Sequence, residues 1–187
     1  MIKRVRCPRR FLPKGKIFYK GSALQMPLTV YEKNNVESGK SCLVMGEVTF
    51  NVLNKPRKQQ PNEFVTNPKP EYVVALNNVK FVKGDDNLIT ALKETMYGEH
   101  DEKLSLSDKS PFPPAIFGKD NKKITGEELI PEGKCLKNGQ TVLVHVTTFT
   151  GHGNVGCGFD AIKLTVPLDD VELQDAGGSV SADVFDL

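Results

Sequence analysis

The sequence lacks tryptophan, and none of its 187 residues belongs to an apolar run long enough to cross a membrane as a helix. Its four cysteines, Cys7, Cys42, Cys135 and Cys157, lie far apart, which favours a reducing cytoplasm over a disulfide framework. No apolar stretch follows the basic first residues, so we expect no secretory signal. Membrane proteins, secreted disulfide scaffolds and large multidomain enzymes are therefore set aside.

Charge of one sign is missing from each end of the chain. Residues 1–20 contain eight Lys and Arg and no acid, whereas residues 168–187 contain six acids and no base. From totals of 25 basic and 23 acidic side chains, 17 of each sign remain in the body. This asymmetry indicates a polyanionic partner for the basic segment. The alternative is that the terminal charges only keep the protein soluble.

Most of the body has the alternation and the β-branched residues that are typical of strands. Strands are predicted at 42–53, 72–76, 79–82, 141–149 and 159–166, with an Asn-Asn turn between the second and the third. Weaker strand patterns occur at 2–5, 17–19 and 28–31.

One helix is predicted where Leu88, Leu92 and Met96 recur at helical spacing, with cap candidates before it and Gly98 as a stop signal. A short helical turn is expected from Thr125, and residues 99–123 have the composition of a long surface insertion. Short strands around one inserted helix predict a mainly β fold, a small antiparallel barrel or sandwich. We expect one domain over residues 1–173, including a basic extension over 1–44, and a disordered acidic tail over 174–187.

The motifs of small-molecule chemistry are present only in part. Residues 151–156 match G-x-G-x-x-G, but the residues after them predict a strand and not the helix that would hold a phosphate, so we expect a Gly-rich connection between antiparallel strands. Gly39-Lys40-Ser41 lacks the helix of a P-loop for the same reason. His145, His152 and Cys157 lack the spacing of a metal site. No cofactor, metal or catalytic residue is therefore expected.

Basic residues alternate with aromatic residues in several segments. Binding of single-stranded nucleic acid needs this mixture, because cations follow the phosphates while exposed rings stack on bases. Any single ring of this kind is also a candidate core residue, so the evidence lies in the set. The candidate DNA-binding residues are Arg4, Arg6, Arg9, Arg10, Lys14, Lys16, Phe18, Tyr19, Lys20, Lys55, Arg57, Lys58, Phe64, Lys69, Tyr72 and Phe149.

Three stretches and the end of the chain, taken in order, resemble the single-stranded DNA-binding proteins of tailed bacteriophages. The stretches are residues 50–56, residues 72–76 with the helix after them, and residues 144–164 with Gly153-Asn154-Val155-Gly156. Residues 183–187 are similar to the family's acidic-aromatic tail.

The resemblance implies an OB-like barrel that is not an enzyme and that coats single-stranded DNA in phage replication or recombination, in the cytoplasm of the host cell. It also implies that the tail recruits replication or recombination proteins through Asp183, Phe185, Asp186 and Leu187.

Two other readings are consistent with the residues. One is a phage structural or assembly β protein whose charged ends dock on neighbouring subunits. The other is an RNA-binding or regulatory β-barrel. Whether the chain forms a homo-oligomer is left open by the sequence.

Overall fold

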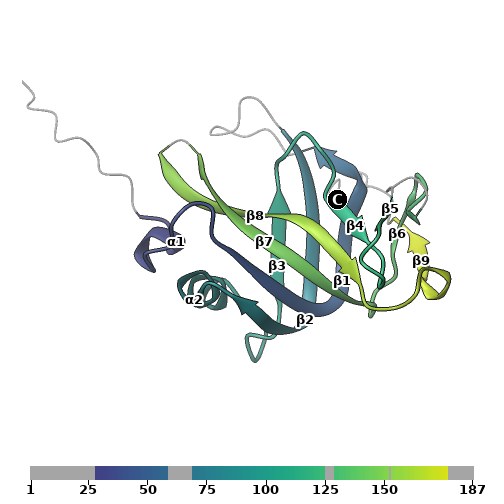
Figure 1. Cartoon of the computed structure of the whole chain (residues 1–187), viewed down its shortest axis with the longest axis horizontal. Helices are drawn as coiled ribbons and strands as arrows, with labels where there is room; N and C mark the ends of the chain where they lie inside the picture. Colours follow the sequence, from purple (N-terminus) through teal and green to yellow (C-terminus); the bar gives the residue numbers. More distant parts are fainter. Residues whose placement is uncertain (1–27, 59–68, 125–128, 152, 177–187) are drawn as a thin grey trace, which may run out of the picture.

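The computed structural model describes residues 28–58, 69–124, 129–151 and 153–176 (Figure 1). These residues are mainly β, as predicted. The strands are β1 (Ser41–Lys58), β2 (Pro70–Gly84), β3 (Leu104–Asp108), β4 (Ala115–Phe117), β5 (Lys123–Ile124), β6 (Lys134–Leu136), β7 (Thr141–Gly151), β8 (Asn154–Leu164) and β9 (Leu173–Asp175). The helices are α1 (Val30–Lys33), α2 (Asp86–Glu94) and a 3-10 turn, η1 (Leu168–Asp170).

Seven strands form one sheet in the order β3-β2-β1-β7-β8-β4-β5, and β6 pairs with β9. The sheet curls, so that its edge strand β3 meets β8. Asp108 on β3 lies against Gly158 on β8, because Oδ1 of Asp108 is 2.9 Å from the point where a Cβ on Gly158 would stand. The strands β1, β2, β3, β8 and β7 thus enclose a partly open, five-stranded barrel. This arrangement confirms the OB-like fold, with one correction, because β4 pairs with β8 in parallel.

The long first strand takes part in both halves of the barrel. It pairs antiparallel with β7 on one side and with β2 on the other, and its register with β2 shifts at four places. At Gly46 a Cβ would stand only 3.0 Å from the carbonyl oxygen of Asn77 and from Cβ of Leu76. Glycine therefore lets β2 approach closely where β1 bends through the barrel.

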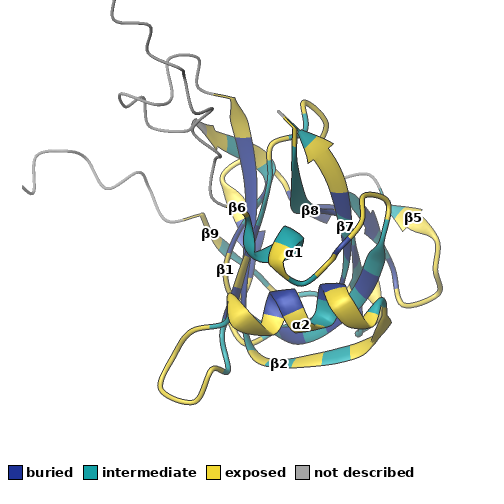
Figure 2. Cartoon of the chain, turned by 90° about the vertical axis from the view of Figure 1, so that its left-hand side faces the viewer, coloured by how far each residue is buried: buried dark blue, intermediate teal, exposed yellow. Residues whose placement is uncertain are grey.

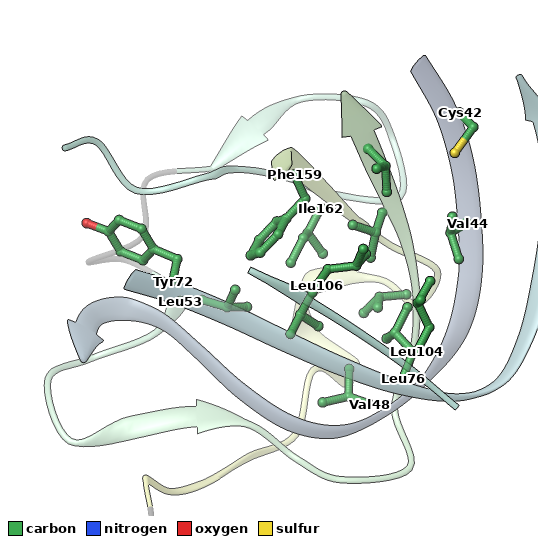
Figure 3. Packing of buried hydrophobic residues seen from close by; sticks show 14 of the residues in the cluster. Cys42, Val44, Val48, Leu53, Tyr72, Leu76, Leu104, Leu106, Phe159 and Ile162 are labelled. Carbon is green, nitrogen blue, oxygen red and sulfur yellow. The ribbon is translucent and has the colours of Figure 1, made fainter. Parts of the chain in front are cut away.

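The core fills the inside of this barrel (Figure 3). Val44 and Val48 from β1 meet Leu76, Leu104 and other apolar side chains from the facing strands, all fully buried or nearly so. Apolar burial of this kind is the main favourable contribution to folding.

The predicted helix is present as α2. The side chain of Asp85 accepts a hydrogen bond from the backbone N–H of Leu88 at 3.0 Å, which satisfies one of the free donors at the helix start. Leu88, Ala91 and Leu92 are buried against the strands, and Figure 2 shows the opposite face of α2 exposed. The helix ends at Glu94, so Met96 lies beyond it.

Three expectations about secondary structure were wrong. The two strands predicted at 72–76 and 79–82 are one strand, β2, because Asn78 takes a positive φ of 52° within the strand and a shift of register absorbs the turn signal. Residues 99–123 are not an insertion, since they supply β3 and β4. The segment 28–31 enters α1, whose capping box joins Thr29 to Glu32.

Other predictions fall on residues outside the described ranges. These are the weak strands at 2–5 and 17–19, the helical turn from Thr125 to residue 128, and the tail from residue 177 onward. The predicted start of the tail at residue 174 falls within β9, which pairs with β6.

Candidate nucleic-acid interface

The topology of the barrel singles out one surface for a strand-like ligand. In OB-like barrels oligonucleotides bind across the second and third strands and the loops between strands one and two and strands four and five. The corresponding elements here are β2, β3, the β1–β2 connection and the β7–β8 hairpin, which projects from the barrel (Figure 1). Residues Glu71–Leu76 of β2 are all buried, so we call candidate interface the exposed Phe50 on β1 together with residues 109–114, 147–151 and 153–158.

Phe149 is the best-supported ring of this surface. It lies opposite Gly156 in the hairpin and is 48% exposed. Its ring atoms Cε2 and Cζ lie 3.3 and 3.4 Å from the point where a Cβ on Gly156 would stand, and Cε1 lies 3.4 Å from the same point on Gly158. The ring therefore packs against glycine backbone, while half of its surface stays open to a base.

A groove of about 310 Å³ opens beside Phe149, between the β3–β4 connection and β8. It is lined by Asp108, Ser110, Phe112, Pro113, Pro114, Thr147, Phe159 and Asp160. Phe112 is 74% exposed at its rim, so the groove offers a second ring. Two rings beside a small, partly apolar groove suit flat ligands such as nucleobases.

Two carboxylates face this groove and set its charge. Partial burial raises the pKa of the Asp108 carboxyl, and the nearby Asp160 raises it further, although the backbone N–H of Ser110 donates to Asp108 at 3.2 Å and acts in the opposite sense. Oδ1 of Asp160 lies 2.6 Å from Nδ1 of His145. These charges repel phosphate, so the groove fits a base better than it fits the backbone of a nucleic acid.

Phe50 is a further exposed ring that the sequence analysis did not select. It lies opposite Ala75, which in turn lies opposite Ser105 on β3, so the three share the outer face of the sheet. Because Ala75 and Ser105 have small side chains, they cover little of the Phe50 ring, and Phe50 is 47% exposed.

The position of Phe50 follows from a shift in register. Val48 is buried, and strict alternation would bury Phe50 as well. A shift between these two residues turns Phe50 outward and Asn51 inward, where its side chain bonds both backbone groups of Leu136. The other exposed ring outside the predicted set is Phe112, which lies in a Pro-rich segment whose composition predicts only a surface insertion.

Tyr72 requires a correction. We expected it among the stacking rings, but it is only 4% exposed and belongs to the core (Figure 3). It alternates with Val73 and lies on the inner face with Val74 and Leu76 of the same strand, so it is not open to a base.

Two of the four candidate cations within the described ranges, Arg57 and Lys55, are engaged in ion pairs. Nε of Arg57 lies 2.7 Å from Oε2 of Glu71, whose side chain is only 12% exposed, and Nζ of Lys55 lies 2.9 Å from Oε1 of Glu132. Because Arg57 compensates a nearly buried carboxylate, its first role is structural. Lys69 is exposed and directly precedes β2, and Lys58 is the last residue of β1.

The described chain begins next to the hairpin that carries Phe149. The hydroxyl of Thr29 donates to the carbonyl of Val155 at 3.1 Å, and the backbone N–H of Val155 donates to Glu32 at 3.2 Å. The hydroxyl of Tyr31 lies 2.9 Å from Sγ of Cys157, and burial raises the pKa of both groups, so both are neutral near pH 7. These contacts fasten α1 to the candidate interface, and the basic segment precedes α1 in the chain.

The remaining predicted site residues lie outside the described ranges. They are Arg4, Arg6, Arg9, Arg10, Lys14, Lys16, Phe18, Tyr19, Lys20 and Phe64, and the tail residues Asp183, Phe185, Asp186 and Leu187. Their roles stay predictions.

The glycine-rich motif is the hairpin connection that we expected. Gly151 and Asn154 are partners at the end of the antiparallel β7–β8 pair, and Gly153 has a φ of +85°. Among the described residues, no group of three or more His, Cys, Asp and Glu side chains is arranged to hold a metal. In the same residues no helix has the length and apolar character to span a membrane.

No protein-family model matches the sequence, and a search of curated protein sequences likewise gives no match. Solved structures do match. The single-stranded DNA-binding protein from bacteriophage Enc34 is 12% identical with a TM-score of 0.43, and the match covers 77% of this chain and 90% of that chain.

Two further structures of the Enc34 protein are also similar. Its C-terminal truncation has a TM-score of 0.37, 9% identity, and coverage of 65% of this chain and 84% of that chain. Its complex with ssDNA has a TM-score of 0.34, 9% identity, and coverage of 65% and 85%. These are proteins of the kind that the sequence resembles. At such TM-scores the likeness assigns no function to this chain.

Proposed function

We propose that this protein binds single-stranded DNA without sequence preference. The observation that carries the proposal is the Phe149 ring, packed on glycine backbone and open beside the groove that Phe112 rims. Every base has a face that can stack on such a ring, so contacts of this kind do not discriminate between sequences. Duplex DNA keeps its bases stacked and does not offer these faces.

The phosphates are assigned to cations outside the groove. The eight Lys and Arg of residues 1–20 precede α1, which is fastened to the hairpin, and Lys69 lies at the β1–β2 connection. In this arrangement bases enter the groove while the backbone follows the basic residues. The two kinds of contact together give binding that depends on salt but not on sequence.

The role proposed for this binding is to coat and protect single-stranded DNA in phage replication or recombination, in the cytoplasm of the host. The chain acts in this role as a binding protein and not as an enzyme. Residues 183–187 recruit partner proteins through Asp183, Phe185, Asp186 and Leu187.

The test is a titration of the full chain against labelled oligo-dT, followed by fluorescence anisotropy, with duplex DNA of equal length as the control. A label is needed because the chain has no tryptophan. If about four to six phosphates are neutralised, the slope of log affinity against log salt is about −3 to −4 for a single strand. Equal binding of duplex and single strand would contradict the proposal.

No binding at low salt would equally contradict it. That outcome would favour the assembly protein that the sequence left open.

A further inference from the structure

A second cavity adjoins the groove of the candidate interface. Its volume is about 440 Å³, within the range of ligand-binding clefts. The end of β1, the segment that runs into β4 and the residues before β6 all contribute to it. Its apolar walls are Leu53, Pro113, Pro114, Ile116, Ile130 and Pro131. We call this cavity the proline pocket.

The proline pocket and the groove share a wall. Pro113 and Pro114 line both cavities, so this dipeptide stands between them. Neighbouring Cα atoms in a chain are about 3.8 Å apart, which makes the shared wall short. A DNA strand advances about 3.4 Å per nucleotide even when its bases are stacked in a duplex. Nucleotides a few positions apart in one strand can therefore reach both cavities.

One oriented polar group faces the apolar walls of the proline pocket. The side-chain amide of Asn54 is held in place, because its Nδ2 donates to the carbonyl of Ile130 at 2.6 Å and to that of Pro131 at 2.7 Å. Its Oδ1 accepts no hydrogen bond from the described residues, so it is an acceptor for a ligand. Every nucleobase carries an N–H on its pairing edge, so this acceptor suits a base without selecting a sequence.

A cation stands at the rim of the proline pocket. Lys55 and Glu132 both line it, and their ion pair of 2.9 Å joins side chains that are 74% and 82% exposed. An exposed pair of this kind contributes little to stability, so Lys55 can exchange Glu132 for a phosphate. The groove itself offers phosphate the acids Asp108 and Asp160, whereas the rim of the pocket offers a lysine.

We propose that the proline pocket takes a second nucleobase of the single strand whose other base occupies the groove. The inference rests on the proposed function and extends the interface to residues 53–55 and 130–132. The wall shared with the groove and the cation at the rim favour a nucleotide of the same strand over an apolar side chain of a protein partner.

The experiment uses the full chain and oligo-dT in which one thymidine is replaced by photoreactive 4-thiothymidine. This base crosslinks only to groups in direct contact with it. After irradiation and digestion, we expect crosslinked peptides from residues 109–114 and 147–158, and also from residues 53–55 and 130–132. Unlabelled oligo-dT should compete for both sets.

Matched variants test the role of the rim. Lys55→Glu replaces an attraction for phosphate by a repulsion, so it should lower the ratio of pocket crosslinks to interface crosslinks roughly threefold or more. Lys83→Glu makes the same change of charge at an exposed position of β2 that lines neither cavity, and should leave this ratio unchanged.

An exchange of charges distinguishes a lost phosphate contact from a lost fold. Lys55→Glu combined with Glu132→Lys returns a cation to the rim and should restore the pocket crosslinks. Crosslinks confined to the candidate interface while oligo-dT stays bound, or an equal fall of the ratio in Lys55→Glu and Lys83→Glu, would overturn this inference and leave the proposed function standing. If oligo-dT does not bind at all, the proposed function fails, and this inference fails with it.

Discussion

The two halves of the β7–β8 hairpin have the same pairing but opposite surroundings. In the body half, residues 141–146 pair with 159–164, and Val142, Val144 and Ile162 are fully buried. In the distal half, residues 147–151 pair with 154–158, four glycines stand at 151, 153, 156 and 158, and Phe149 is half exposed. One hairpin therefore supplies both the barrel wall and the best ring for a ligand.

The change occurs at one irregularity. The register shifts between His145 and Val146, which leaves Asp160 as an extra residue on β8, and Asp160 lies against the ring of His145. A bulge bends a strand and re-aims the side chains that follow. The bulge re-aims the side chains of β8, whereas β7 keeps its alternation as far as Phe149 and still buries Thr148 in the distal half.

The largest effect is expected in the body half. Ile162→Ala removes a fully buried side chain that lies opposite both Val144 and Ile116, so the free energy of unfolding should fall by about 2–5 kcal/mol. Denaturant unfolding of the variant and the parent measures this. A loss below about 1 kcal/mol would show that the body half is not the core element that the account requires.

In the distal half the corresponding substitution should act on binding and not on folding. Phe149→Ala should weaken binding of oligo-dT roughly 5- to 150-fold, the equivalent of one stacked base, with little change in melting temperature. Tyr97→Ala is the matched control, because Tyr97 is similarly exposed, 47% against 48%, but lies outside the candidate interface. Equal losses of affinity for oligo-dT in the two variants would show that Phe149 does not stack on a base.

A smaller loss of affinity for oligo-dT is expected when Gly156, which packs against the Phe149 ring, is replaced. A Cβ on Gly156 would stand 3.3 Å from the Phe149 ring, so Gly156→Ala should displace the ring slightly and weaken binding by less than about fivefold. Gly151→Ala is the control, since its Cβ would keep an ordinary 3.7 Å from the same ring. If both alanines bind as the parent does, the glycines do not position the ring.

The smallest expected effect concerns Asp108 at the edge of the groove. Its raised pKa means that the folded protein holds this proton more tightly than the unfolded chain does. The stabilisation is complete below the unfolded pKa of about 3.9 and is lost as the pH rises through the folded value. Asp108→Asn should therefore raise the melting temperature near pH 7 and have no such effect near pH 3. A gain that is the same at both values would contradict this assignment.

The sequence predicted the regular parts of the fold. The Val- and Thr-rich alternation of residues 141–149 gave β7, and the spacing of Leu88 and Leu92 after Asp85 gave α2. These elements bury one face against the core, so their pattern is periodic and local. The strand β3 was missed because it has only five residues, Leu104–Asp108, and its outward positions are serines in a polar segment.

The rings of the site could be predicted only in part, because outward orientation depends on register. Phe149 keeps the alternation of β7, so its outward orientation could be predicted from the sequence. Phe50 was missed because a shift after Val48 reverses its face, and Tyr72 was chosen although it faces the core. Such shifts arise from pairing between distant segments and leave no pattern in one strand.

The ion pairs were equally hidden from the sequence. Arg57 and Glu71 lie opposite each other only because the β1–β2 register resumes beyond the shift after Val52. A count of basic residues therefore overstated how many cations in the body are available to phosphates.

The central claim is that the distal half of the hairpin, and not the body half, receives single-stranded DNA. Hydrogen exchange of the full chain with and without oligo-dT tests it most directly, because both halves are read in one experiment. We expect new protection in residues 109–114, 147–151 and 153–160, which include the groove residues Phe159 and Asp160, and no DNA-dependent change in residues 141–146 and 161–164. DNA that binds without protecting residues 147–158 would contradict the claim.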